Sequence, residues 1–128
     1  MKILKLCLYS LLASFSQLSL ANDRIVRLSE LEIEPTMITP YLEILKTEAA
    51  ASVKLEPGVI SIFPMTPKDS PNSVRILEIY SNKKAYEAHL QTPHFKIYKS
   101  STLHMVKSLK LIDMNEVDPE SMAKIFKK

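Results

Sequence analysis

Polar and apolar residues alternate along residues 24–33 (RIVRLSELEI), which predicts a β-strand with one buried face. Three more apolar stretches of strand length follow at residues 59–65, 74–80 and 106–114. Pro64 lies inside the first of these three. Because proline donates no hydrogen bond to a ladder, we expect that strand at a sheet edge or at a bulge. The pattern therefore predicts four strands.

Helical periodicity fills the gap between the first two predicted strands. Apolar residues recur there at the spacing of one helix face: Ile38, Leu42, Leu45, Ala49 and Val53. We expect Thr39 to cap this helix, Pro40 to lie in its first turn and the helix to run to about Lys54. A second helix is expected over residues 82–91, with Ser81 as its cap.

The second helix is expected to break at Thr92-Pro93 and restart. Threonine is a good cap and proline suits the first helical position, so a further helix should run from there to about Leu103. The resulting order is β-α-β-β-α-β, with the second helix in two pieces. This order is typical of the ferredoxin-like split βαβ fold, an α+β architecture with helices on one face of a four-stranded antiparallel sheet.

The predicted strands carry apolar residues on both faces. Both sets of alternating positions contain them: Val59, Ile60, Ile62, Phe63, Ile76, Leu77 and Ile79. A sheet covered by helices on one side only should alternate more cleanly. We therefore expect a second copy to cover the open face, in a twofold homodimer whose sheets pack face to face.

The two ends of the chain are expected to lie outside this domain. Residues 1–21 have a basic start, a ten-residue apolar run and small residues before Asn22, which is typical of a signal peptide. We expect an exported protein, periplasmic or secreted, with no stable membrane span after cleavage, because the apolar run is too short to cross a bilayer. A retained N-terminal anchor is the alternative. The domain is expected over residues 22–115, and residues 116–128 form a tail with a short helix.

Composition excludes several kinds of site. The single glycine, Gly58, rules out a phosphate-binding loop or a dinucleotide fingerprint, and the single cysteine, Cys7, leaves with the signal peptide. The formal net charge of +3 is too small and too scattered to indicate nucleic-acid binding. The histidines at 89, 94 and 104 lack the spacing of a helical zinc site, so no metal site is expected.

Several motifs resemble the antibiotic biosynthesis monooxygenase family, and within it the small quinol monooxygenase-like proteins. The motifs are Glu56-Pro57-Gly58-Val59, Ile76-Leu77-Glu78-Ile79-Tyr80, Ala85-Tyr86-Glu87-Ala88-His89-Leu90, and Thr92-Pro93-His94-Phe95 with Tyr98. The resemblance covers nearly all of the chain after the signal. It implies a dimeric α+β barrel with a pocket between sheet and helices, in a superfamily that includes oxygenases using neither metal nor flavin, heme-degrading proteins and isomerases.

Two departures from the family bear on the cofactor. Tyr80 stands where the family often has a tryptophan, which the heme-degrading branch uses to distort its heme. Lys99 stands near the position of that branch's iron-ligating histidine and cannot replace its imidazole. The resemblance therefore implies chemistry without a cofactor, with heme kept as the alternative.

His94 is the first candidate for a catalytic base. It lies in the first turn of the helix after Thr92, where the helix dipole disfavours a protonated imidazole and leaves a neutral ring that accepts protons. Removing a phenolic proton from a quinol gives an electron-rich anion that can reduce oxygen. Tyr80 would donate a hydrogen bond to the quinol oxygen. Alternatively, His94 packs at the helix break and Tyr80 packs in the core.

A planar substrate would need an apolar lining with a few polar groups. The expected substrate-binding residues are Tyr41, Phe63, Glu78, His89, Phe95 and Tyr98. Glu78 would orient a histidine or pair with Lys99, or form a structural ion pair, and the aromatic residues would otherwise be plain core. We predict a cofactor-independent monooxygenase that acts on a small quinol-like aromatic. The alternative is an exported, non-catalytic module that binds a small aromatic ligand or heme.

Overall fold

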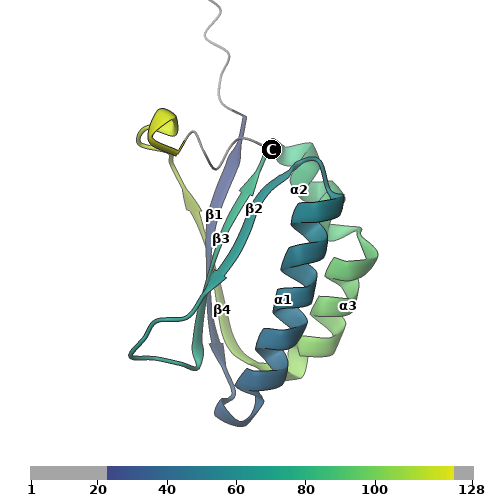
Figure 1. Cartoon of the computed structure of the whole chain (residues 1–128), viewed down its shortest axis with the longest axis vertical. Coiled ribbons are helices and arrows are strands. Elements are labelled where there is room, and N and C mark those ends of the chain that lie inside the picture. The colour runs from purple at the N-terminus through teal and green to yellow at the C-terminus, as the bar shows by residue number, and fades with distance from the viewer. Residues whose placement is uncertain (1–22, 123–128) are drawn as a thin grey trace, which may run out of the picture.

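Strands and helices follow one another along the chain in the order expected from the sequence (Figure 1). The computed structural model describes residues 23–122, so the expected signal peptide and the last six residues of the tail lie outside the described part. The elements are β1 (Ile25–Ile33), α1 (Ile38–Leu55), β2 (Val59–Met65), β3 (Ser73–Tyr80), α2 (Lys83–Leu90), α3 (Pro93–Thr102) and β4 (Val106–Met114), with 3₁₀ turns at Pro35–Met37, Leu103–Met105 and Pro119–Met122. Within residues 23–122, none of the helices has the length and apolar content that crossing a bilayer would require.

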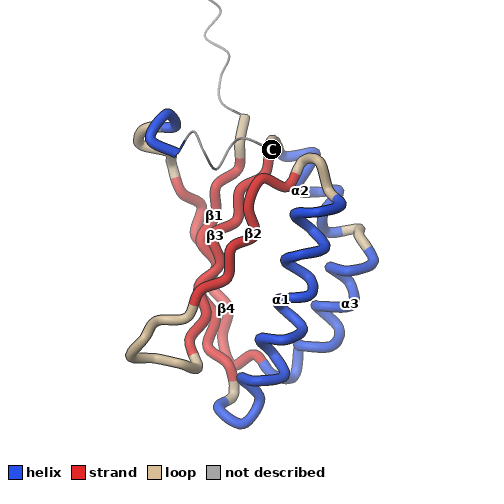
Figure 2. Tube along the Cα trace, viewed as in Figure 1, coloured by secondary structure: helices blue, strands red, loops and turns tan. Residues whose placement is uncertain are grey.

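The strands form one antiparallel sheet in the order β2-β3-β1-β4. All the helices α1, α2 and α3 lie against the same side of this sheet (Figure 2). This arrangement confirms the ferredoxin-like α+β fold. Pro64 lies on the edge strand β2, as expected, while the irregularity of the ladder falls between Val59 and Ser61 instead.

The expected cap of α3 is confirmed. The Oγ1 of Thr92 accepts a hydrogen bond from the backbone N–H of Phe95 at 3.3 Å, and Pro93 is the first helical residue. The same hydroxyl donates to the backbone carbonyl of His89 at 2.7 Å. Thr92 therefore joins the end of α2 to the start of α3.

The caps expected for α1 and α2 are wrong. A 3₁₀ turn leads directly into α1 at Ile38, so Thr39 is already inside the helix, and no side chain caps it. Ser81 still belongs to the strand end, because its backbone N–H donates to the carbonyl of Gly58 at 2.9 Å. Asn82 is the first residue free to cap α2, and its Oδ1 accepts from Ala85 N–H at 2.8 Å.

The main core lies between the sheet and the helices. Its fully buried large side chains include Ile33, Tyr41, Leu45, Val59, Val74 and Tyr80. The turn after α1 presses against α2 at Gly58, where a Cβ would lie 2.4 Å from the Cβ of Ala85. Only glycine allows this approach, and it brings residue 56 close to the end of α2.

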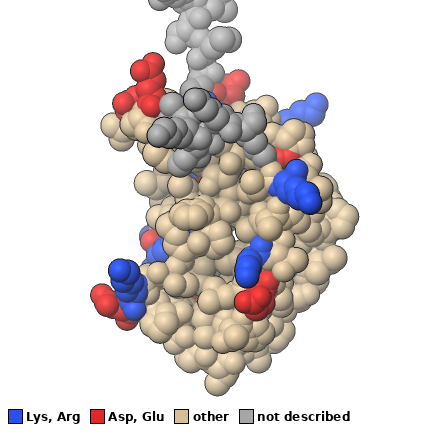
Figure 3. All heavy atoms as spheres, in the orientation of Figure 1, with Lys and Arg blue, Asp and Glu red and all other residues tan. Residues whose placement is uncertain are grey.

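The open face of the sheet carries an apolar row that crosses all four strands. Phe63 pairs with Leu77, Leu77 with Leu28, and Leu28 with Ile112. Phe63 is 59% exposed, and the other three are half-buried. On the side of the molecule seen in Figure 3, charged side chains are few and lie singly or in small groups on a largely uncharged surface.

Candidate functional site

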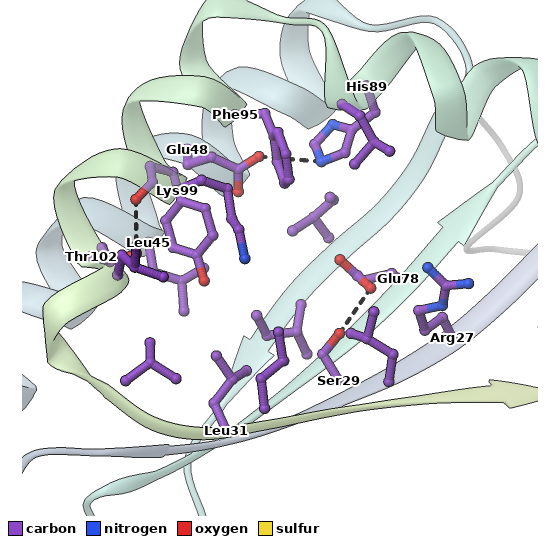
Figure 4. Close-up of a pocket in the computed structure, with 18 of the residues that line it drawn as sticks. Arg27, Ser29, Leu31, Leu45, Glu48, Glu78, His89, Phe95, Lys99 and Thr102 are labelled. Carbon is purple, nitrogen blue, oxygen red and sulfur yellow. Dashed lines mark hydrogen bonds and ion pairs between the residues drawn. The ribbon is translucent and has the colours of Figure 1, made fainter.

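A cavity of about 290 Å³ opens between the sheet and the helices (Figure 4). Its apolar wall includes Leu31, Leu45, Ile62, Ile76, Leu109 and Leu111. Its polar and aromatic groups are Arg27, Ser29, Glu48, Glu78, Tyr80, Tyr86, His89, Phe95, Tyr98 and Lys99, among others. Ionisable groups inside an apolar cavity are typical of ligand-binding and catalytic sites.

Glu78 is the carboxyl group at the sheet side of the cavity. Alternation along β3 places Ile76, Glu78 and Tyr80 on the covered face. Glu78 accepts hydrogen bonds from Ser29 Oγ at 2.9 Å and Tyr80 OH at 3.4 Å. Burial raises the pKa of Glu78, against the opposing effects of the Ser29 hydrogen bond and the positive charge of Arg27. The group is therefore a stronger base than an exposed carboxylate once it is ionised.

Two cationic side chains, Arg27 and Lys99, line the cavity. Arg27 belongs to β1, and Glu78 on β3 lies opposite it in the register of the two strands. Its guanidinium lies 4.8 Å from the centroid of the Tyr86 ring and bonds Asp113 at 2.8 Å. Lys99 extends from α3 into the same space (Figure 4). These positive charges favour an anion bound in the cavity.

The phenol groups of the site stay protonated. Tyr98 lines the cavity, and its hydroxyl lies 2.7 Å from that of Tyr41, which is fully buried behind it. Burial raises the pKa of Tyr98 to about 12, and it raises the pKa values of Tyr41 and Tyr80 further still. Each hydroxyl is therefore available as a hydrogen-bond donor at neutral pH.

A chain of carboxyl and imidazole groups runs from the cavity towards the surface. Glu48, on the buried face of α1, accepts a hydrogen bond from Ser52 Oγ at 2.7 Å, and its Oε1 lies 3.6 Å from His89 Nε2. On the other side of the ring, His89 Nδ1 lies 3.0 Å from Glu56 Oε2. The same oxygen lies 2.7 Å from His94 Nε2.

The two glutamates of this chain differ in their electrostatics. Burial raises the pKa of Glu48, with the Ser52 hydrogen bond opposing. Burial would also raise the pKa of Glu56, but the hydrogen bonds from His94 and His89 outweigh it and the pKa falls below its ordinary value. Glu56 is therefore an ionised carboxylate that holds two imidazoles.

The structure brings five of the predicted site residues together in the cavity lining: Glu78, Tyr80, His89, Phe95 and Tyr98. The other three lie elsewhere. His94 contacts Glu56 and is 19% exposed, because the start of α3 turns its ring away from the cavity and back towards the turn after α1. Tyr41 lies behind Tyr98. Phe63 points to the open face, because its neighbour Ile62 takes the covered one.

Sequence reasoning did not single out Ser29, Arg27, Glu48 or Glu56 as site residues. Glu48 carried a signal, since it lies three residues after Leu45 on the apolar face of its helix, where a carboxylate is unexpected. Glu56 reaches the histidines across 33 and 38 residues of chain, and no local pattern records such a contact.

Comparisons with known proteins agree with this fold. The sequence model of the family described as antibiotic biosynthesis monooxygenase matches residues 24–100. A crystal structure of a candidate antibiotic biosynthesis monooxygenase from Bacteroides thetaiotaomicron is 45% identical, with a TM-score of 0.74 over 75% of this chain and 91% of that one. Among proteins with curated functions, none matches this chain.

Two further solved structures are similar. A candidate monooxygenase from Lactobacillus acidophilus is 31% identical with a TM-score of 0.72, and the match covers 73% of this chain but only 45% of that one. A candidate antibiotic biosynthesis monooxygenase from Nitrosomonas europaea shares the fold at 17% identity, with a TM-score of 0.71 over 77% of this chain and 94% of that one. The family match and the 45% identical relative confirm the resemblance found in the sequence. The chain belongs to the antibiotic biosynthesis monooxygenase family.

Proposed function

We propose that this protein is a monooxygenase that oxidises a small quinol-like aromatic inside the cavity between sheet and helices. The observation that carries the proposal is the position of Glu78, a buried carboxyl group with a raised pKa beside the Tyr80 hydroxyl and near Arg27. Family membership supports the reaction class. The cavity of about 290 Å³ lies near the lower end of ligand sites, which suits a compact ring system.

The first step is proton transfer from a phenolic hydroxyl to the Glu78 carboxylate. Arg27 and Lys99 stabilise the aryloxide that forms. Once Glu78 holds the proton, the Tyr80 hydroxyl turns from Glu78 and donates its hydrogen bond to the aryloxide oxygen. The electron-rich ring then reduces O₂ and forms a carbon–oxygen bond, and cleavage of the O–O bond releases water. Quinol plus O₂ gives hydroxyquinone plus water, so the substrate supplies all four electrons and needs no flavin or heme.

A histidine base would be His89 in this geometry. The His89 ring lines the cavity, whereas His94 lies outside the cavity lining and is linked to His89 through the Glu56 carboxylate. Comparing variants of Glu78 and His89 separates the two assignments. We assign the proton transfer to Glu78 because both Ser29 and Tyr80 hold its carboxylate at the cavity wall.

Oxygen consumption with a panel of reduced quinones tests the proposal. Glu78→Gln keeps the shape of the side chain but removes the base, so kcat should fall at least about 100-fold while substrate binding persists. Glu87→Gln is the matched control, because Glu87 is exposed on α2 and pairs with Lys83, and its turnover should equal that of the wild type.

Two results would contradict the oxygenase proposal. One is turnover no faster than autoxidation across the panel, and the other is unchanged turnover in Glu78→Gln. Quinone binding without oxygen consumption would instead support the non-catalytic binding module.

We also propose that the protein acts as a homodimer through its open sheet face and that it is exported. The apolar row from Phe63 to Ile112 supports the dimer, because an apolar stripe across a sheet is stabilised when a second sheet covers it. The signal-like sequence of residues 1–21 supports export. Fractionation of cells that express the full-length chain tests the second point, and a cytoplasmic, uncleaved product would overturn it.

A further inference from the structure

We propose that Glu56, His89 and His94 bind a first-row transition-metal dication such as Zn²⁺. Each residue offers one ligand atom, and these atoms all lie within 4.8 Å of one another. Two imidazole nitrogens and one carboxylate oxygen form a ligand set that suits Zn²⁺, Co²⁺ and Fe²⁺. The oxygenation proposed above does not require this ion.

The distances between the ligand atoms suit coordination. His94 Nε2 and His89 Nδ1 lie 2.7 Å and 3.0 Å from Glu56 Oε2. Metal–ligand bonds of about 2.0–2.2 Å separate neighbouring ligand atoms by about 3.0–3.5 Å. Small side-chain movements therefore accommodate an ion among the three.

The break between α2 and α3 produces this convergence. Residues five apart on one continuous helix point about 140° away from each other. The chain instead turns at Thr92 and restarts, and the rings of His89 and His94 lie with centroids 6.4 Å apart on the same carboxylate. The spacing of the histidines alone does not reveal this site, because its third ligand, Glu56, lies far away in the sequence.

The ring nitrogen of His89 that faces away from Glu56 lies near a second carboxyl group, as is common for a histidine that binds a metal. His89 Nδ1 faces Glu56, and its other nitrogen, Nε2, lies 3.6 Å from the Glu48 carboxyl group, which Ser52 in turn holds. A carboxyl group on this side favours the tautomer that carries its proton on Nε2 when Nδ1 coordinates an ion. This arrangement distinguishes the cluster from a chance meeting of polar side chains.

The three ligands differ in exposure in a way that suits reversible loading. The side chain of His89 is 2% exposed, whereas that of His94 is 19% exposed at the rim. Without an ion, a ring nitrogen of each histidine contacts the Glu56 carboxylate, and each of these nitrogens must be free of a proton to coordinate a dication. The ion would tie the end of α1 to α2 and α3 and should raise the unfolding temperature.

Co²⁺ titration of tag-free, chelator-treated protein tests the site directly. We expect visible d–d absorption that saturates at one ion per chain and that Zn²⁺ displaces. His94→Gln should lose this spectrum, and so should Glu56→Gln. His104→Gln is the matched control, because His104 is exposed and outside the cluster, and it should keep the spectrum.

The wild-type protein supplies a second measurement that does not depend on how the variants fold. Histidine ¹⁵N NMR with Zn²⁺ should show coordination through Nδ1 of one ring and Nε2 of another. Absence of saturable Co²⁺ absorption, or equal loss of it in His104→Gln, would overturn the site. Quinol turnover is measured separately, so a protein that binds the ion but lacks turnover fails only the proposed function.

Discussion

Neighbouring rows on the two faces of the sheet have opposite characters. On the helix-covered face, Ile62 pairs with Glu78, Glu78 with Arg27, and Arg27 with Asp113. The neighbouring row, displaced by one residue along each strand, lies on the open face and is wholly apolar from Phe63 to Ile112. A sheet covered on one side normally places apolar residues under its helices and polar residues towards water, and these rows reverse that order.

The reversal has a different physical meaning on each face. A carboxyl group under helices loses hydration, and such a group is tolerated where hydrogen bonds and charge partners hold it and where its altered acidity has a use. An exposed apolar row gains free energy when it is covered. The covered face therefore contains the proposed reaction, and the open face contains the proposed partner surface.

The largest effect that we expect concerns the open face. Phe63→Glu would place an unpaired carboxylate at the β2 end of the apolar row in the proposed dimer interface, so the dissociation constant should rise on the order of 100-fold. Sedimentation velocity over a range of protein concentrations measures this change. The monomer should keep its fold, because Phe63 does not belong to the buried core.

Ile97→Glu is the matched control for that substitution. Ile97 is 62% exposed, as apolar as Phe63, and lies on α3 away from the sheet. Its charge variant should dimerise like the wild type. Association that weakens equally in both variants, or a wild-type protein that is monomeric at every concentration, would contradict the proposed interface.

The second effect concerns the covered face and its pH dependence. In the folded protein the pKa of Glu78 lies above its ordinary value of 4.5. At a pH between the ordinary pKa and the raised pKa, the folded chain keeps a proton that the unfolded chain releases. The free energy of unfolding should therefore decrease as pH rises through that window. Burial raises this pKa, and Ser29, Arg27, His89 and Tyr80 around the carboxyl group oppose the rise.

Glu78→Gln should reduce this decrease and leave the protein more stable than the wild type above the window. Urea unfolding at a series of pH values between about 4.5 and 8 measures it. Part of the slope should remain, because burial also raises the pKa of Glu48. An identical slope in wild type and variant would contradict the prediction, and the exposed Glu87→Gln should keep the wild-type slope.

Local signals account for most of the predicted fold. Pro64 indicated an edge strand and Thr92 a helix start, and both follow from the chemistry of one residue and its immediate neighbours. The caps at Thr39 and Ser81 failed because tertiary packing moved the helix starts: the 3₁₀ turn starts α1 two residues earlier, and the strand end starts α2 one residue later.

The site was predicted in part from the aromatic residues Phe95 and Tyr98 of the broken second helix and in part from alternation along one strand. That alternation placed Glu78 and Tyr80 on one face of the strand, and both side chains line the cavity. The contact of Glu56 with His89 and His94 depends instead on the close approach of Gly58 to Ala85, two segments far apart in the sequence. Hydrophobic periodicity contains no information on such a contact, so His94 was expected in the cavity rather than beside it.

The smallest effect that we expect tests whether the covered face depends on the break between α2 and α3. Thr92→Ala removes both the cap of α3 and the bond to the His89 carbonyl, so the free energy of unfolding should fall by about 1 kcal/mol. Thr39→Ala is the matched control, since Thr39 is exposed inside α1 and alanine is the better helix former there. Urea unfolding of both variants measures the difference. Equal losses would mean that the Thr92 hydroxyl does not hold the break, and the convergence of His89 and His94 on Glu56 would then depend on packing around Gly58 alone.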